Sequence, residues 1–103
     1  MITVFVADDQ EQVRQGIIDR LGHEKDIGVV GSAGPHDDPL TQVSRARPDV
    51  VLLSEKVGID LSRAILAADP RMRGVMWIAF EDHRALQTVV LSGVTGYVLA
   101  DAR

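Results

Sequence analysis

The sequence predicts an α/β fold built on a doubly wound, five-stranded parallel sheet. Five short apolar runs rich in β-branched residues do not alternate with polar residues, which is typical of strands buried on both faces. Between them lie segments in which apolar residues recur every three or four positions, as on one face of a helix. The resulting order is β-α-β-α-β-α-β-α-β, and right-handed crossovers then place helices on both faces of the sheet.

The positions of the apolar runs give the expected strands. "ITVFVA" opens the chain, "VVLL" lies near its centre and "YVLA" lies close to its end. The full set of expected strands is 2–7, 27–32, 50–53, 75–80 and 97–100.

Start and stop signals mark the helices between these strands. Asp38 followed by Pro39 is typical of a helix start, and Asp82 can cap a later helix. Pro70 and Gly93 mark helix ends. The apolar residues expected to face the core are Val13, Ile17 and Leu21 in the first helix, Leu40 and Val43 in the second, Leu61, Ile65 and Ala68 in the third, and Leu86, Val89 and Val90 in the fourth.

Composition places the chain among ordinary small domains. It has 103 residues, of which 46% are hydrophobic and 25% charged. A net charge of −4 without a basic cluster argues against direct nucleic-acid binding by this chain. The absence of cysteine excludes disulfides and thiolate metal sites, and no apolar run approaches the ~20 residues of a transmembrane helix. We expect a single domain over residues 1–103, located in the cytoplasm.

A sheet wound on both faces needs about five helices, but the pattern contains four. The chain stops just after the last expected strand. Apolar sheet surface is therefore expected to lie open near the first, fourth and fifth strands. We expect a homodimer or a swapped element to cover that surface.

Ligands of doubly wound sheets bind outside the carboxyl ends of the strands. The residues at these ends are therefore the candidates for a functional site. They are Asp8 and Asp9 after the first strand, Ser54 after the third, Ile78 to Phe80 at the fourth, and Ala100 after the fifth.

At these positions the whole chain resembles the receiver domain of two-component response regulators, especially those that precede a LuxR/NarL-type helix-turn-helix. "VFVADDQEQVRQGI" is similar to the first strand, acidic pair and first helix of that family. "RARPDVVLLS" is similar to its third strand, and "DPRMRGVMWIAFEDHRALQTVVLSGVTGYVLAD" matches its strand 4 to strand 5 pattern without a gap. The resemblance implies a flavodoxin-like sheet in the order 2-1-3-4-5.

The resemblance also implies a phosphorelay chemistry. In the family, a carboxylate at the end of strand 3 accepts a phosphoryl group from a phosphohistidine, and a Mg²⁺ held by this carboxylate and the acidic pair neutralises the phosphoryl oxygens. A Thr or Ser after strand 4 and a Lys after strand 5 then bind the phosphate. An aromatic residue on strand 5 rotates with the switch.

This chain matches that pattern only in part. Asp8 and Asp9 stand at the acidic pair and Tyr97 at the strand 5 aromatic. However, three positions of the degenerate phosphorylation site have lost their chemistry, because they hold Ser54 for the acceptor aspartate, Ile78 for the Thr or Ser, and Ala100 for the Lys. The stretch after Ser54 is also shortened, and it lacks the usual proline.

We therefore interpret the chain as a pseudo-receiver that is not an enzyme and works without phosphorylation. By the resemblance, it controls a C-terminal DNA-binding helix-turn-helix domain in transcription regulation, through dimerisation or interdomain contacts. No membrane partner and no cofactor are expected. One alternative is a small-ligand sensor whose pocket is lined by Ile78, Phe80 and Ala100. A Mg²⁺-dependent hydrolase that uses Asp8 and Asp9 is a further alternative.

Each singled-out residue also has a structural interpretation. Asp8 and Asp9 are a weak metal site, or a strand end that favours the first helix. Ser54 is a nucleophile only with a base in reach, and we expect it to be structurally neutral. Tyr97 is a core aromatic or a surface switch.

Four other residues have similar alternatives. Arg84 and Gln87 form an interface or an ordinary solvated face. Trp77 stacks on a ligand or packs in the core. Glu55 is expected to point away from Ser54 by strand alternation, and so not to replace the lost acid.

Overall fold

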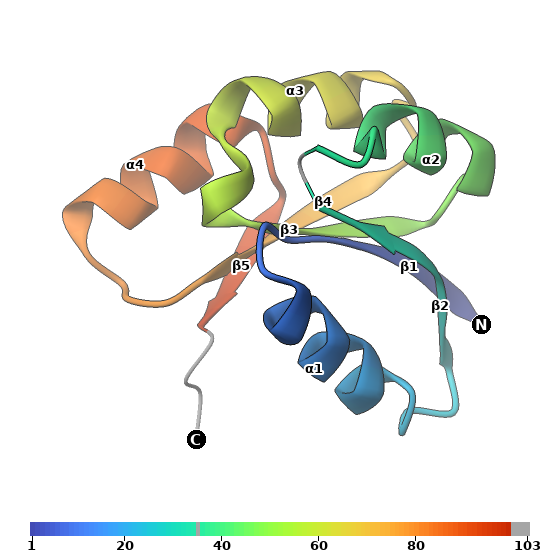
Figure 1. Ribbon diagram of the computed structural model, residues 1–103. Helices are drawn as coiled ribbons and strands as arrows, with labels where there is room; N and C mark the ends of the chain where they lie inside the picture. The colour runs from blue at the N-terminus through green and yellow to red at the C-terminus, as the bar shows by residue number, and fades with distance from the viewer. Residues whose placement is uncertain (35, 100–103) are drawn as a thin grey trace.

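The computed structural model describes residues 1–34 and 36–99, and it has the predicted fold class. All strand pairs are parallel, and the sheet order is β2-β1-β3-β4-β5 (Figure 1). The strands are β1 (Ile2–Ala7), β2 (Ile27–Ala33), β3 (Val50–Ser54), β4 (Arg73–Ile78) and β5 (Gly96–Leu99).

The helices of the described ranges cover the two faces of the sheet unequally. Figure 1 shows α2, α3 and α4 together on one face and α1 alone on the other. None of these helices is long and apolar enough to cross a membrane. Their bounds are α1 (Glu11–Leu21), α2 (Pro39–Ala46), α3 (Ile59–Ala67) and α4 (His83–Ser92), with a 3₁₀ turn, η1 (Glu55–Val57), directly after β3.

Asp38 and Asp82 cap the helices that they were predicted to start, although Asp38 does so from a left-handed backbone conformation with a φ of 55°. The Asp38 carboxylate accepts a hydrogen bond from the backbone N–H of Thr41 at 3.4 Å, and the Asp82 carboxylate accepts one from Ala85 at 2.8 Å. Gly93 has a φ of 80°, which ends α4 in the left-handed conformation that glycine adopts without strain.

Alternation along β1 divides the core into two parts. Val4 and Val6 point to the α1 face, where they form a small cluster with Ile17. Phe5 and Ala7 point to the other face and join the larger core beneath α2, α3 and α4. The larger core therefore lies on the face that has three helices.

Three residues that were expected to face the core are exposed instead. They are Leu40, Ala68 and Val90, and Val90 is the most exposed of them at 77%. In α2 and α4 the buried stripe is narrower than the apolar pattern, and Ala68 lies just past the end of α3. Val90 lies about 100° around α4 from the buried Val89, so the two cannot both contact the sheet.

Two fully buried serines in the α3–α4 layer make a matched test of hydrogen bonding. Ser92 donates its hydroxyl to the Thr88 carbonyl at 2.7 Å, whereas the Ser62 hydroxyl has no hydrogen-bonding partner among the described residues. A buried hydroxyl without a partner costs stability.

We predict that Ser62→Ala leaves the free energy of unfolding unchanged or raises it by up to about 1 kcal/mol. Ser92→Ala should lower it by about 0.5–1 kcal/mol, because a made hydrogen bond is lost. Urea denaturation followed by circular dichroism measures both changes. A larger loss for Ser62→Ala than for Ser92→Ala would contradict this account.

Candidate functional site

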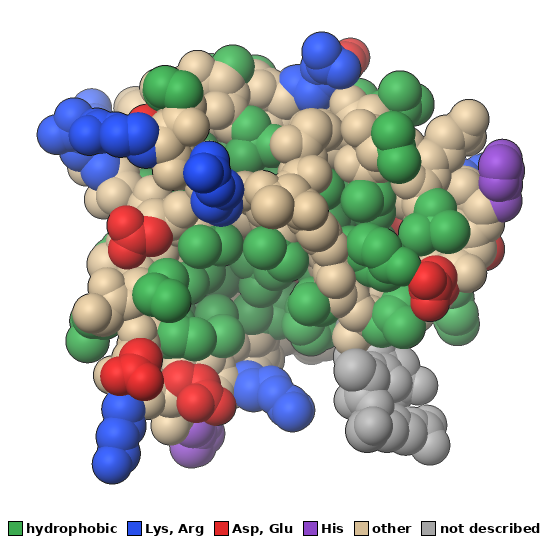
Figure 2. All heavy atoms as spheres, turned by 180° about the vertical axis from the view of Figure 1, so that it is seen from behind, with side chains coloured by type: hydrophobic (Ala, Val, Ile, Leu, Met, Phe, Trp, Pro, Cys, Tyr) green, Lys and Arg blue, Asp and Glu red, His purple; other side chains and the backbone are tan. Residues whose placement is uncertain are grey.

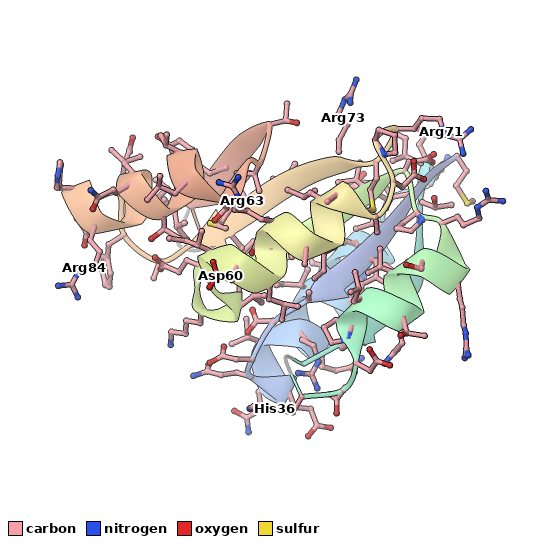
Figure 3. All side chains as sticks on the ribbon, turned by 90° about the horizontal axis from the view of Figure 1, so that it is seen from above. His36, Asp60, Arg63, Arg71, Arg73 and Arg84 are labelled. Carbon is pink, nitrogen blue, oxygen red and sulfur yellow. The ribbon has the colours of Figure 1, made fainter. Side chains whose placement is uncertain are left out.

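The carboxyl ends of β1, β3 and β4 meet at one edge of the sheet. Ala7 pairs with Leu53 across β1 and β3, and Ser54 pairs with Trp77 across β3 and β4. Asp8, Ser54 and Ile78 therefore follow one another along this edge. In Figure 3, which is seen from above, His36, Asp60 and Arg84 lie toward this edge, while Arg71 and Arg73 lie at the opposite edge.

Asp8 is the buried member of the acidic pair. It is 3% exposed, and its Oδ1 accepts a hydrogen bond from the backbone N–H of Gln10 at 3.0 Å. Burial raises the pKa of the Asp8 carboxyl, and the neighbouring Asp9 raises it further, although the Gln10 hydrogen bond acts in the opposite direction. Asp9 itself is exposed. One carboxylate oxygen of Asp8 is therefore already used to fix the backbone at the start of α1.

Ser54 is buried at the end of β3 and holds the turn that follows. Its Oγ accepts a hydrogen bond from the backbone N–H of Lys56 at 3.2 Å and so caps η1. The three histidines, His23, His36 and His83, are all exposed. Among the described residues no histidine forms a hydrogen bond with the Ser54 hydroxyl, as its activation as a nucleophile would require.

The predicted direction of Glu55 was wrong. Strand alternation does not extend past Ser54, because the chain enters η1 there and turns the next side chain back toward β4. The Glu55 Oε1 accepts a hydrogen bond from the backbone N–H of Ala79 at 3.1 Å, directly after the end of β4. Gly58, with a φ of 99°, is the one sequence signal of a sharp turn soon after Ser54.

Ile78 and Phe80 do not line the apolar pocket that was expected. Ile78 is fully buried in the larger core, whereas Phe80 is 75% exposed. Their side chains thus have opposite environments, because β4 ends between them. Ala100, the third expected wall, lies outside the described residues.

Tyr97 is neither a core aromatic nor fully exposed. Its side chain is 37% exposed, and its hydroxyl donates a hydrogen bond to the Glu81 Oε1 at 2.5 Å. This hydrogen bond raises the pKa of the Tyr97 hydroxyl. Arg84 and Gln87 are exposed on α4, as expected for both an interface and a solvated face.

The donor set at the edge does not fit the Mg²⁺ site of an active receiver. Such a site needs several oxygen donors, with carboxylates foremost. Here Asp8 is buried with a raised pKa, and Ser54 contributes a neutral hydroxyl that already accepts a hydrogen bond. No three Asp, Glu, His or Cys side chains in residues 1–34 and 36–99 come together as a metal site.

A second feature is an apolar groove on the face that α1 covers only in part. It has a volume of about 630 Å³ and lies between α1 and the strands β1, β3, β4 and β5. Leu52, Trp77 and Val98 are among its walls, and Arg20 of α1 and Glu24, just after that helix, line it as well. Figure 2 shows hydrophobic side chains gathered in a hollow on this face. Trp77 packs against the small core cluster and borders this groove.

Comparison with known proteins gives relatives that align over nearly the whole chain. No protein-family model matches it. The DNA-binding transcriptional activator DevR/DosR of Mycobacterium tuberculosis is 36% identical over 107 aligned positions, which cover 100% of this chain and 49% of that protein. The response regulator GacA of Pseudomonas aeruginosa is 31% identical over 99% of this chain and 50% of its own length. The chain spans about half the length of these curated relatives.

Solved structures share the same fold. A two-component response regulator of the LuxR family from Aurantimonas has a TM-score of 0.86 at 20% identity, covering 99% of this chain and 76% of its own. The signal receiver domain of NarL from Mycobacterium tuberculosis has a TM-score of 0.84 at 24% identity, covering 99% of this chain and 86% of its own. At these identities the likeness establishes the fold alone.

The sheet order, and an acidic pair at the edge where β1, β3 and β4 end, define a receiver-type α/β domain. The relatives narrow this class further. Along nearly its whole length the chain is similar to response regulators, among them the LuxR-family protein and the NarL receiver domain named above.

The raised pKa of Asp8 gives a pH-dependent prediction. A carboxyl whose pKa is higher in the folded state than in the unfolded state destabilises the fold once pH rises through that folded pKa. Asp8→Asn keeps an oxygen for the Gln10 N–H and removes the buried charge. We predict that it raises stability at neutral pH by up to about 1 kcal/mol.

The gain should disappear in acid, where Asp8 is protonated and neutral as well. Urea denaturation at several pH values checks this, with Asp9→Asn as the exposed control. A gain that stays constant from neutral to acid pH would contradict the assignment of the effect to the Asp8 charge.

Proposed function

We propose that this receiver domain works without phosphorylation and regulates a C-terminal DNA-binding helix-turn-helix domain in transcription regulation. In this proposal residues 1–103 form one regulatory domain of a cytoplasmic protein. The output is reached through dimerisation or interdomain contacts. The chain itself neither contacts nucleic acid nor carries out catalysis.

The observation that carries the proposal is the coherent loss of phosphate chemistry at the carboxyl edge. Ser54 is neutral and buried, and its hydroxyl is used within η1. Ile78 is buried in the core and offers no side-chain hydrogen bond. Ala100 adds the third loss, because alanine cannot form an ion pair with a phosphate.

The transcriptional part of the proposal draws on the relatives. DevR/DosR is described as a DNA-binding transcriptional activator, and a solved neighbour from Staphylococcus aureus as a DNA-binding response regulator. DevR/DosR is about twice as long as its region that aligns with this chain, which leaves room in that protein for an output domain.

We predict that incubation with acetyl phosphate and Mg²⁺ produces no acid-labile phosphoryl adduct on this chain. The reason is that neither a strand 3 carboxylate nor a phosphate-binding partner is present. Intact-mass spectrometry measures the adduct, and a receiver that has the acceptor aspartate is treated in parallel as the positive control. A stoichiometric acid-labile adduct would sink the proposal.

The dimer in this proposal uses the apolar groove beside α1, with a second copy of the chain as the occupant. Arg20 in the last turn of α1 and Glu24 in the connection that follows the helix both line the groove and carry opposite charges. Around a twofold axis that passes near the end of α1, Arg20 of one copy would lie near the partner's Glu24. The same arrangement would cover the apolar strand residues of both copies.

Gly16 lies on the groove wall, and a Cβ added there would meet no atom within 4 Å. We predict that the wild type is a dimer by light scattering at high concentration and that Gly16→Lys is a monomer, because a charge would enter the apolar interface. Gly16→Ala is the matched control and stays dimeric. Arg20→Glu should weaken the dimer, and adding Glu24→Arg should restore it.

A wild-type chain that remains monomeric at high concentration would argue against this interface. So would a Gly16→Lys variant that dimerises as tightly as Gly16→Ala.

A further inference from the structure

The segment between β4 and α4 is attached to three different elements by three carboxylates. Glu55 of η1 accepts a hydrogen bond from the Ala79 backbone N–H at 3.1 Å. Glu81 accepts one from the Tyr97 hydroxyl of β5, and Asp82 accepts one from the Ala85 N–H in the first turn of α4. Of these three contacts, the one from Glu55 reaches the segment from the end of the neighbouring strand, β3, across the carboxyl edge of the sheet.

The sequence around Glu55 accounts for its position. Ser54 ends β3, and its Oγ accepts from the Lys56 N–H, which closes η1. Val57 is buried beneath this turn and anchors it to the larger core. With Ser54 and Val57 both fixed, the Glu55 side chain between them leaves the strand direction and reaches the end of β4.

The contact puts the Glu55 carboxylate beside the first backbone N–H after β4. A hydrogen bond to a charged acceptor is stronger than one between neutral groups. Glu55 is half-buried and Ala79 is exposed, so the bond lies at the surface of the edge rather than in the core. The neighbouring Ser54 and Ile78 offer no charge of their own.

We propose that Glu55 is an internal anion that holds the 79–82 segment, and through it the Tyr97–Glu81 pair, in one fixed arrangement. This rests on the proposed phosphorylation-independent function, since a fixed carboxylate stands at the edge where an active receiver would acquire a phosphoryl group. The arrangement is then constant, and the chain presents one surface at α4 and β5 without an external signal. Glu55 acts as a positioning residue.

The test compares Glu55→Ala with Glu55→Gln and with Asp60→Asn as the matched control. Asp60 lies at the start of α3, toward the same edge, and is exposed (Figure 3). Asp60→Asn changes the net charge by the same amount as Glu55→Gln, and the Asp60 carboxylate is not the one bonded to Ala79. Circular dichroism confirms that each variant is folded.

Hydrogen exchange measured by NMR follows the Ala79 amide directly. In Glu55→Ala its protection should fall on the order of tenfold to a hundredfold, as expected for the loss of a hydrogen bond to a charged group. Glu55→Gln should show a smaller fall, because its amide oxygen still accepts. Asp60→Asn should leave the protection unchanged.

The ring signals of Tyr97, the single tyrosine of the chain, give the readout that separates positioning from a purely local contact. They should shift in Glu55→Ala and stay in place in Asp60→Asn. Unchanged Ala79 protection in Glu55→Ala would overturn the proposal, and so would lost protection without any change at Tyr97.

These experiments use no phosphodonor. A phosphoryl adduct on the wild type would contradict the proposed function, but the measured effect of Glu55 on the Ala79 amide would still stand. Conversely, failure of the Glu55 test would leave the absence of phosphorylation untouched.

Discussion

The pairing of β3 between β1 and β4 is the constraint on which the other features of this domain depend. Because the three strands are parallel and in register, their carboxyl ends converge at one edge, and Asp8, Ser54 and Ile78 become neighbours. A buried carboxylate at Asp8 is tolerated best when its neighbours add no further negative charge. A neutral serine at the end of β3 fits that requirement, whereas an aspartate there would need a cation.

The same sheet also explains why the two faces differ. The alternation of β1 sends Phe5 and Ala7 to the face with three helices and Val4 and Val6 to the face with α1 alone. One helix cannot cover five strands, so an apolar groove remains beside α1. The groove lies on this face, whereas Ser54 and Ile78 belong to the edge, so the proposed dimer surface and the proposed degenerate site occupy separate parts of the domain.

Much of the fold could be predicted from the sequence, because the strands are continuous apolar runs and the helices carry clear capping residues. Asp82 and Gly93 have the geometry that their residue types indicate, and Asp38 caps its helix as predicted but from a left-handed conformation. Val90 was misjudged because periodicity alone does not say how wide the buried stripe of a helix is. The converging positions of Asp8, Ser54 and Ile78 were predicted, since strand ends are fixed by strand order.

Glu55 was not predicted correctly. The rule of alternation holds only within a strand, and the strand ends at Ser54, where a serine hydroxyl closes a 3₁₀ turn. The prediction of a pocket lined by Ile78 and Phe80 was wrong for a related reason, because β4 ends between these two residues and their side chains have different environments. Boundaries between elements depend on such local hydrogen bonds, which the pattern of apolar residues does not encode.

The central claim, that the carboxyl edge no longer accepts a phosphoryl group, is tested most directly with a phosphoryl mimic. Beryllium fluoride and Mg²⁺ can be titrated into the protein while the backbone amide signals of Asp8, Ser54 and Ala79 are followed by NMR. We predict no saturable shift at these three residues, because the acceptor position at the end of β3 holds Ser54 in place of an aspartate. A saturable shift at all three with one-to-one stoichiometry would contradict it.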